Sequence, residues 1–95
     1  MLLEEASKEF TEAFIWYEEQ QAGLGLLFRQ KVYSKLEKIC KEPFHYKPSH
    51  TKFHEALVDK FPFIIVYAID EEIPEIIVFA IFHTSRNPKK KFNRK

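Results

Sequence analysis

Two apolar runs in the second half of the chain constrain its fold most strongly. Residues 63–69 and 76–82 consist of β-branched, aromatic and other apolar residues, and the mostly charged stretch 70–74 joins them. Runs of this composition favour strands, and a short charged connection between them predicts an antiparallel hairpin. Because both runs are continuously apolar, we expect cover on both faces for part of the sheet.

The first half of the chain has the periodicity of two helices. Residues 1–22 carry apolar side chains at spacings of three and four, and residues 24–42 repeat this pattern until Pro43 ends it. The only glycines, Gly23 and Gly25, suit a tight reversal that needs a left-handed residue. We predict an α+β fold, in which this helical hairpin packs on a small antiparallel sheet within residues 52–83.

Three residues of the predicted helices have expected roles in stability. Glu18 and Glu19 lie near the negative end of the first helix dipole, which is an unfavourable position. Cys40 continues the apolar spacing of the second helix, which predicts a small buried side chain rather than a nucleophile. A single cysteine forms no internal disulfide, so we expect a cytoplasmic protein.

Charge is distributed unevenly along this chain of 95 residues, although its net charge is only +1. The first 22 residues hold six acids and one lysine, whereas residues 86–95 hold six Lys or Arg and no acid. Such a basic tail is typical of a solvated terminus or, alternatively, of a segment that binds nucleic acid or an acidic partner. The length fits one domain over residues 1–95, and no apolar stretch approaches the ~20 residues that span a bilayer.

The sequence lacks the motifs of most enzyme classes. It has no glycine-rich phosphate loop, no paired cysteines and no serine elbow. His45, His50 and His54 flank a proline and do not share a helix face, so we predict no metal site and no cofactor. The one polar cluster with chemical potential is residues 83–86, where a histidine could move a proton and an arginine could hold a phosphate or carboxylate. The structural alternative is a histidine bonded to backbone and an arginine paired with a surface acid.

Three segments together resemble a known family. Residues 14–25 read FIWYEEQQAGLG, residues 60–67 read KFPFIIVY and residues 78–88 read VFAIFHTSRNP. In this order they resemble the RelE/ParE superfamily of bacterial toxins, which includes plasmid stabilisation proteins. The resemblance implies a growth-inhibiting toxin of a type II toxin–antitoxin pair, a helical hairpin on an antiparallel sheet, and a cognate antitoxin that wraps the toxin.

The resemblance implies two kinds of target. RelE-like members cut messenger RNA on the ribosome, whereas ParE-like members inhibit DNA gyrase. RelE-like members carry an arginine where residues 62–66 hold no cation, and many relatives carry one where this chain has His54. Arg86 and His83 match the arginine and histidine at the strand exit, but Ser85 stands where a second arginine is often found. The incomplete set favours a ParE-like toxin that binds gyrase and is not an enzyme.

Two alternatives remain open at this point. A ribosome-dependent, metal-independent endoribonuclease would use His54 or His83 as base and Arg86 as phosphate clamp. An inactive relative would only bind an antitoxin. The candidate contacts with a target or nucleic acid are basic residues: Arg86, Lys52, Lys60, Lys89, Lys90 and Lys91.

The resemblance also implies a strand before the first helix. Family members carry several apolar residues there, whereas only Met1, Leu2 and Leu3 precede Glu4. Either the start of the chain is trimmed, or this strand is short or missing and a sheet edge is open. The antitoxin or a second copy of the chain would fill that edge, giving a toxin–antitoxin hetero-oligomer or a homodimer.

Overall fold

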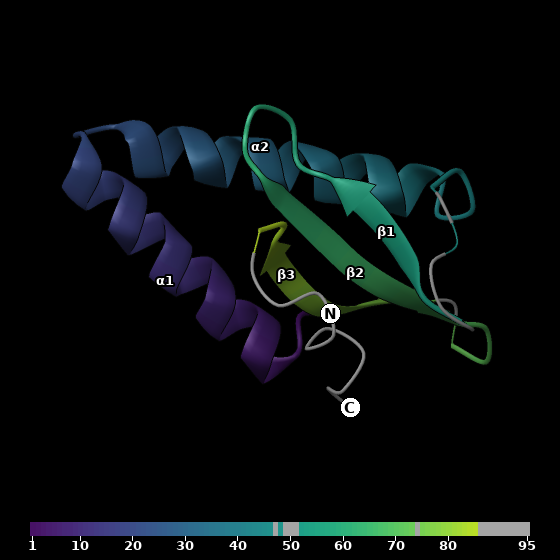
Figure 1. The fold of residues 1–95 in the computed structure, drawn as a ribbon. Helices are drawn as coiled ribbons and strands as arrows, with labels where there is room; N and C mark the ends of the chain where they lie inside the picture. Colours follow the sequence, from purple (N-terminus) through teal and green to yellow (C-terminus); the bar gives the residue numbers. More distant parts are fainter. Residues whose placement is uncertain (47, 49–51, 74, 86–95) are drawn as a thin grey trace.

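The computed structural model describes residues 1–46, 48, 52–73 and 75–85, and it has two helices followed by three strands (Figure 1). The elements are α1 (Glu4–Gln20), α2 (Leu24–Lys41), β1 (His54–Leu57), β2 (Phe63–Asp70) and β3 (Glu75–His83). The strands form an antiparallel sheet in the order β1-β2-β3. The predicted α+β fold, a helical hairpin on a small antiparallel sheet, is confirmed. No helix of the described part is long and apolar enough to cross a membrane.

The two helices are joined by a tight turn and diverge from it (Figure 1). Away from the turn, α1 packs against β3. Gly23 has a φ of 92°, the left-handed conformation that a glycine adopts most readily. Gly25, which we expected in the same turn, instead lies in the first turn of α2 and is buried. A Cβ atom there would lie 2.5 Å from the carbonyl oxygen of Phe14, so this glycine permits the close approach of the helices.

Glu18 connects the end of α1 to the beginning of α2. Its carboxylate accepts hydrogen bonds of 3.1 Å from the backbone N–H groups of Gly23 and Leu26. The bond from Gly23 is the strongest of the effects that lower the pKa of Glu18 below its usual value. The expectation that Glu18 is unfavourably placed was wrong, because the carboxylate faces the positive end of the α2 dipole as well as the negative end of its own helix.

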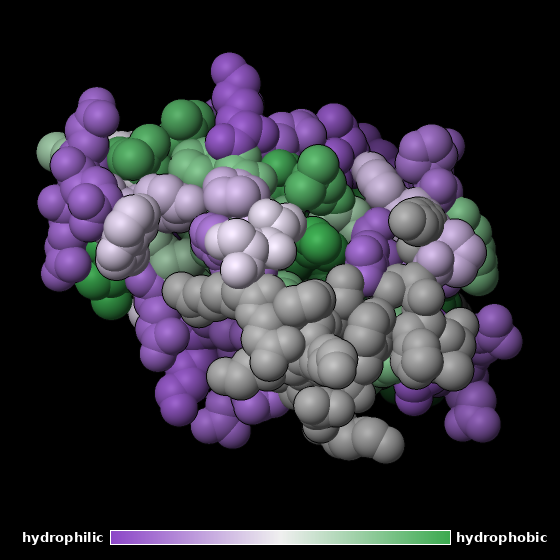
Figure 2. All heavy atoms as spheres, in the orientation of Figure 1, coloured by the Kyte–Doolittle hydropathy of each residue, from purple (hydrophilic) through white to green (hydrophobic). Residues whose placement is uncertain are grey.

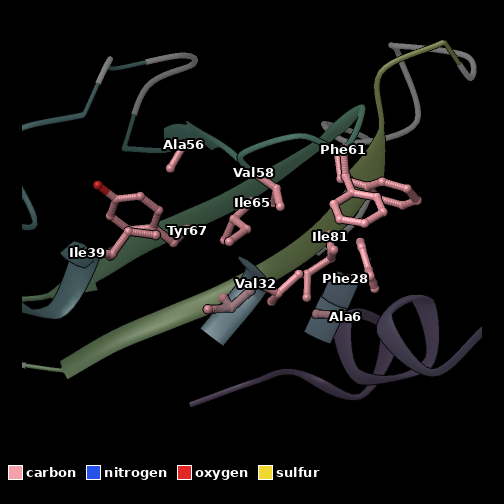
Figure 3. Packing of buried hydrophobic residues seen from close by; sticks show 12 residues of the cluster. Ala6, Phe28, Val32, Ile39, Ala56, Val58, Phe61, Ile65, Tyr67 and Ile81 are labelled. Atoms are coloured by element: carbon pink, nitrogen blue, oxygen red, sulfur yellow. The ribbon is translucent and has the colours of Figure 1, made fainter. Parts of the chain in front are cut away.

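The main core lies between the helical hairpin and the sheet (Figure 3). From α2, Phe28 and Val32 are fully buried against the sheet. The ring of Phe28 lies 5.2 Å from that of Phe61 and 5.0 Å from that of Phe63, both in edge-to-face geometry. These contacts explain the large share of phenylalanine in so short a chain, since aromatic rings bury much apolar area per residue.

Cys40 is exposed, so the prediction of a small buried side chain at this position was wrong. Its neighbour Ile39 is fully buried and faces the core. One residue further along a helix, the side chain points about 100° away. Cys40 therefore falls beside the buried stripe of α2 rather than on it.

The second face of the sheet has a smaller buried cluster. Val66, Ala80 and Phe82 form it, and Phe53 and Ile64 pack against it. The expectation that parts of the sheet are buried on both faces therefore holds for β2 and β3.

The strand expected before the first helix is reduced to one bridge. Leu2 pairs with Val78 in the parallel sense, along the outer edge of β3. The backbone N–H of Leu3 donates to the carbonyl of Val78 at 3.0 Å, and α1 begins at the next residue. The residues before α1 thus form a bridge with β3 rather than one of the three strands of the sheet.

Candidate functional site

The structure holds the two candidate catalytic histidines apart. In the sheet register, His54 lies opposite Tyr67 of β2, whereas His83 lies opposite Phe63. The separation is about 13 Å along the strand and about 10 Å across two strand spacings. The two histidines therefore cannot act on one phosphate group.

His54 is engaged in packing on the β1 side of the sheet. Its ring stacks on Tyr67 with centroids 5.3 Å apart. Its Nδ1 lies 3.1 Å from the carbonyl oxygen of Tyr46, and since a carbonyl only accepts, Nδ1 donates and carries the proton. His54 thus stabilises the connection that precedes β1.

His83 is oriented by the turn that follows β3. Its Nδ1 accepts a hydrogen bond of 3.1 Å from the backbone N–H of Ser85, which places the proton of the neutral ring on Nε2. The Ser85 hydroxyl oxygen lies 2.8 Å from the same nitrogen, and the ring of Phe63 packs against the imidazole at 5.1 Å. The structural alternative, a histidine bonded to backbone, therefore describes His83, while Arg86 lies outside the described residues.

Two of the candidate cations, Lys52 and Lys60, lie within the described residues. Lys52 Nζ lies 5.8 Å from the ring of Phe53 and 5.9 Å from that of Phe79, beside the smaller core cluster. Lys60 is exposed in the turn between β1 and β2, where its φ is 69°. The other basic candidates, Lys89, Lys90 and Lys91, lie outside the described residues. The described residues contain no group of three or more His, Cys, Asp or Glu that could hold a metal ion.

A groove of about 400 Å³ lies between α1 and the end of β3, and we call it the α1–β3 groove. Its walls combine two carboxylates with aromatic and small apolar side chains, and its lining includes no lysine or arginine among the described residues. The lining residues are Glu9, Glu12, Ala13, Trp16, Tyr17, Phe63, Ile81, His83 and Ser85. The groove is therefore acidic on the helix side and apolar at its base.

Sequence reasoning found His83 and Ser85 in this groove but missed its α1 wall. Glu9 and Glu12 are spaced by three, so they share a face of α1 beside the apolar stripe that begins at Ala6. Trp16 is 55% exposed although it is the largest side chain in the protein. The sequence did carry a signal, a tryptophan that follows two acids on one helix. It could identify a groove only once the last strand was known to lie next to α1.

Large apolar side chains are also exposed where the helices meet, and we call this surface the hairpin-end patch. Figure 2 shows hydrophobic side chains gathered over this end of the molecule, at the upper left. The patch consists of Ile15, Trp16, Leu26 and Leu27. Trp16 also lines the α1–β3 groove. Exposed apolar patches of this kind mark sites of protein association.

Comparison with known proteins agrees with this architecture. The search among curated proteins found no match. The sequence model of the family described as "ParE toxin of type II toxin-antitoxin system, parDE" matches residues 1–88, which is nearly the whole chain. The chain therefore belongs to the ParE toxin family, and it is a toxin of a type II toxin–antitoxin system.

Proposed function

We propose that this toxin arrests bacterial growth by binding DNA gyrase in the cytoplasm, and that a cognate antitoxin neutralises it. The observation that carries the proposal is the composition of β2: Phe63–Asp70 contains no lysine, arginine or histidine. Cleavage of RNA by its own 2′-hydroxyl needs a base, an acid and cations around one phosphate. A middle strand without cations favours a toxin that binds its target over one that cuts RNA.

The α1–β3 groove supports the same choice. His83 lines the groove together with Glu9 and Glu12, and His54 lies at the opposite end of the sheet. Two carboxylates repel a phosphate backbone rather than attract it. The groove is thus better suited to a protein segment than to RNA.

The hairpin-end patch supports a protein target. Trp16 is 55% exposed, Ile15 is 48% exposed and Leu26 is 49% exposed. Tryptophan is among the residues that contribute most to protein–protein binding, because its large rigid surface is desolvated on contact. In this proposal the patch contacts gyrase, and the basic candidates add electrostatic contacts: Lys52, Lys60, Arg86, Lys89, Lys90 and Lys91.

One observation favours the ribosome-dependent endoribonuclease as a second candidate. The His83 ring is oriented by the hydrogen bond from Ser85 and lines the α1–β3 groove, with the proton of the neutral ring on Nε2. In that case Arg86→Ala would abolish cleavage of ribosome-bound messenger RNA while the protein stays folded. Retained cleavage by this variant would refute the clamp role of Arg86.

Induction of the toxin in bacteria without an antitoxin tests the proposal. We expect growth arrest, loss of negative supercoils from a reporter plasmid, and intact 5′ ends on translated messenger RNA. Trp16→Ala should weaken the arrest, whereas Phe44→Ala, which removes an exposed ring outside the hairpin-end patch, should not. Cut messenger RNA with unchanged plasmid topology would contradict gyrase binding, and growth without arrest would indicate an inactive relative.

A further inference from the structure

One side of α2 carries a row of lysines that has no part in the proposed function so far. Lys31, Lys35 and Lys38 are spaced by four and three, so they share a face of the helix, and we call them the α2 lysine row. Lys35 identifies this face, because its Nζ lies 3.5 Å from Asp59 Oδ1 and 5.5 Å from the ring of Tyr46. The row therefore lies along the side of α2 that faces the turn between β1 and β2.

The arginine and the acid of α2 lie away from this row. Arg29, the only arginine of the helix, lies 5.7 Å from the ring of Phe14 and so is on the side that faces α1. Glu37, the only acid of the helix, lines a separate hollow together with Tyr33 and Cys40. The α2 lysine row thus contains cations of one kind and no carboxylate of its own helix.

Lys60 adds a further cation from the turn between β1 and β2, which Figure 1 shows beside α2. The residue before Lys60 pairs with Lys35, and the ring of the residue after it, Phe61, lies 5.2 Å from that of Phe28. Lys31 lies between Phe28 and Lys35 along the helix. The turn therefore brings Lys60 to the level of Lys31.

The stability of the fold does not explain these positions. Lys31 and Lys35 are four residues apart on one helix, and like charges at this spacing repel each other. Lys60 has a φ of 69°, a left-handed conformation that is less favourable for a lysine than for a glycine. Strained backbone of this kind is concentrated at binding and active sites. Within the described residues Lys31, Lys38 and Lys60 form no ion pair, so their charges can act on a ligand.

A row of lysines without arginine favours a nucleic-acid backbone over an acidic protein surface. Arginine is the usual cation of protein interfaces, because its guanidinium binds a carboxylate through two hydrogen bonds, whereas lysine is a mobile point charge. Duplex DNA presents about one charge per 1.7 Å of its axis and attracts such point charges in any register. At 1.5 Å per residue, the row from Lys31 to Lys38 is about 10 Å long, which is enough to follow several phosphates.

We infer that the α2 lysine row and Lys60 bind the phosphate backbone of the duplex DNA that gyrase holds. Leu27 of the hairpin-end patch lies one helical turn before Lys31, on the same side of α2. A toxin that contacts gyrase through this patch therefore has its lysines next to the contact. The inference rests on the proposed function for gyrase, but the contact with DNA can be measured without gyrase.

Binding of a labelled duplex to the full-length toxin tests the inference. Fluorescence anisotropy of a fluorescein-labelled duplex of about 20 base pairs gives the affinity over a series of salt concentrations, and each phosphate contact contributes about 0.9 to the slope of log affinity against log salt. We expect Lys31→Gln and Lys38→Gln each to lower the slope by about this amount and to weaken binding about tenfold at ~50 mM salt. Lys8→Gln, which removes the same charge from an exposed position of α1, should change neither quantity.

Lys60→Gly separates binding from folding. Glycine adopts the left-handed conformation readily, so this variant should melt no lower than the wild type. It should nevertheless bind the duplex more weakly, because one phosphate contact is lost. Weaker binding by an equally stable protein cannot result from unfolding.

The basic tail is the competing site for DNA on this chain. Its Lys89, Lys90 and Lys91 lie outside the described residues, and a variant with all three changed to glutamine removes their charge. We expect Lys31→Gln to weaken binding of the wild type and of this tail variant by the same factor. An effect of the tail change alone, with the α2 variants at wild-type affinity, would overturn the inference.

Further results would also overturn it. They are no binding of the duplex by the wild type at low salt, an equal loss with Lys8→Gln, and tighter binding of poly-glutamate or single-stranded RNA than of the duplex. Gyrase inhibition without DNA binding would refute only this inference. DNA binding through the lysines without gyrase inhibition would refute the proposed target and leave the DNA contact standing.

Discussion

At the scale of single residues, the turn between the helices depends on one residue without a side chain, Gly25, and one with a long side chain, Glu18. Gly25 has no Cβ, which lets α2 approach the backbone of Phe14. Glu18 uses its long side chain to reach the N–H groups of Gly23 and Leu26. The turn is therefore stabilised by close packing on one side and by charge-assisted hydrogen bonds on the other.

Gly25→Ala should destabilise the protein. The added Cβ would lie 2.5 Å from the Phe14 carbonyl oxygen and 2.6 Å from Glu18 Cγ, so the helices must separate. Overpacking of this kind costs about 1–3 kcal/mol, and the melting temperature should fall by at least about 4 °C. Thermal unfolding followed by circular dichroism measures the change. Gly23→Asn is the control, because asparagine tolerates the left-handed conformation; a Gly25→Ala protein as stable as the wild type would refute close packing here.

Glu18→Gln should lower stability in a pH-dependent way. The pKa of Glu18 is lowered in the folded state, chiefly by the hydrogen bond from Gly23, so its ionised form stabilises the fold. That contribution is present above the pKa of the unfolded chain and is lost as the pH falls through the folded pKa. The variant should therefore melt below the wild type at neutral pH and together with it in acid. The neighbouring Glu19→Gln serves as control, and a Glu18→Gln difference that persists in acid would contradict the role of the ionised carboxylate.

At the scale of elements, β2 links the helical hairpin to both outer strands. Tyr67 is fully buried in this strand, and its hydroxyl donates a hydrogen bond of 2.6 Å to the carbonyl of Pro43, just beyond α2. Burial, with a smaller effect of Tyr46, raises the pKa of Tyr67 to about 12. One side chain therefore fastens the middle strand to the segment that leaves the second helix.

Tyr67→Phe should lower the free energy of unfolding by about 1 kcal/mol, because the Pro43 carbonyl loses its partner. Urea unfolding measures the change, and Tyr33→Phe, at an exposed position on α2, should change stability by less than about 0.5 kcal/mol.

The pH dependence of the same pair gives an independent check. The phenol stabilises the fold while protonated, so this contribution is present below the ordinary pKa of 10.0 and is lost as the pH rises through about 12. The wild type should lose more stability than Tyr67→Phe over this range. Equal losses would show that the hydroxyl does not stabilise the folded state.

The elements could be predicted from sequence because their patterns are local. The continuous apolar runs of residues 63–69 and 76–82 became β2 and β3 almost without change, since only a strand pair buries them so completely. The side chains at the margins were harder to predict. Cys40 continued the helical spacing yet lies beside the buried stripe, and Glu18 met its partners only through the turn geometry at Gly23.

At the scale of the whole molecule, functional surfaces arise where distant segments meet. The α1–β3 groove joins Glu9 to Ile81, and nothing in the spacing of either segment indicates that they are neighbours. Sequence reasoning therefore identified the strand exit at His83 but not the acidic wall opposite it. The fold also separates His54 from His83. Both side chains could act as a base, and the sequence did not show that they lie at different places in the sheet.

The most direct test of the account is a supercoiling assay with purified components. Increasing amounts of the full-length toxin are added to DNA gyrase and relaxed plasmid, beside translating ribosomes that receive the same amounts. We predict that supercoiling falls as the toxin concentration rises, while ribosome-bound messenger RNA stays intact. Unchanged supercoiling together with ribosome-dependent cuts would contradict a toxin that acts by binding gyrase.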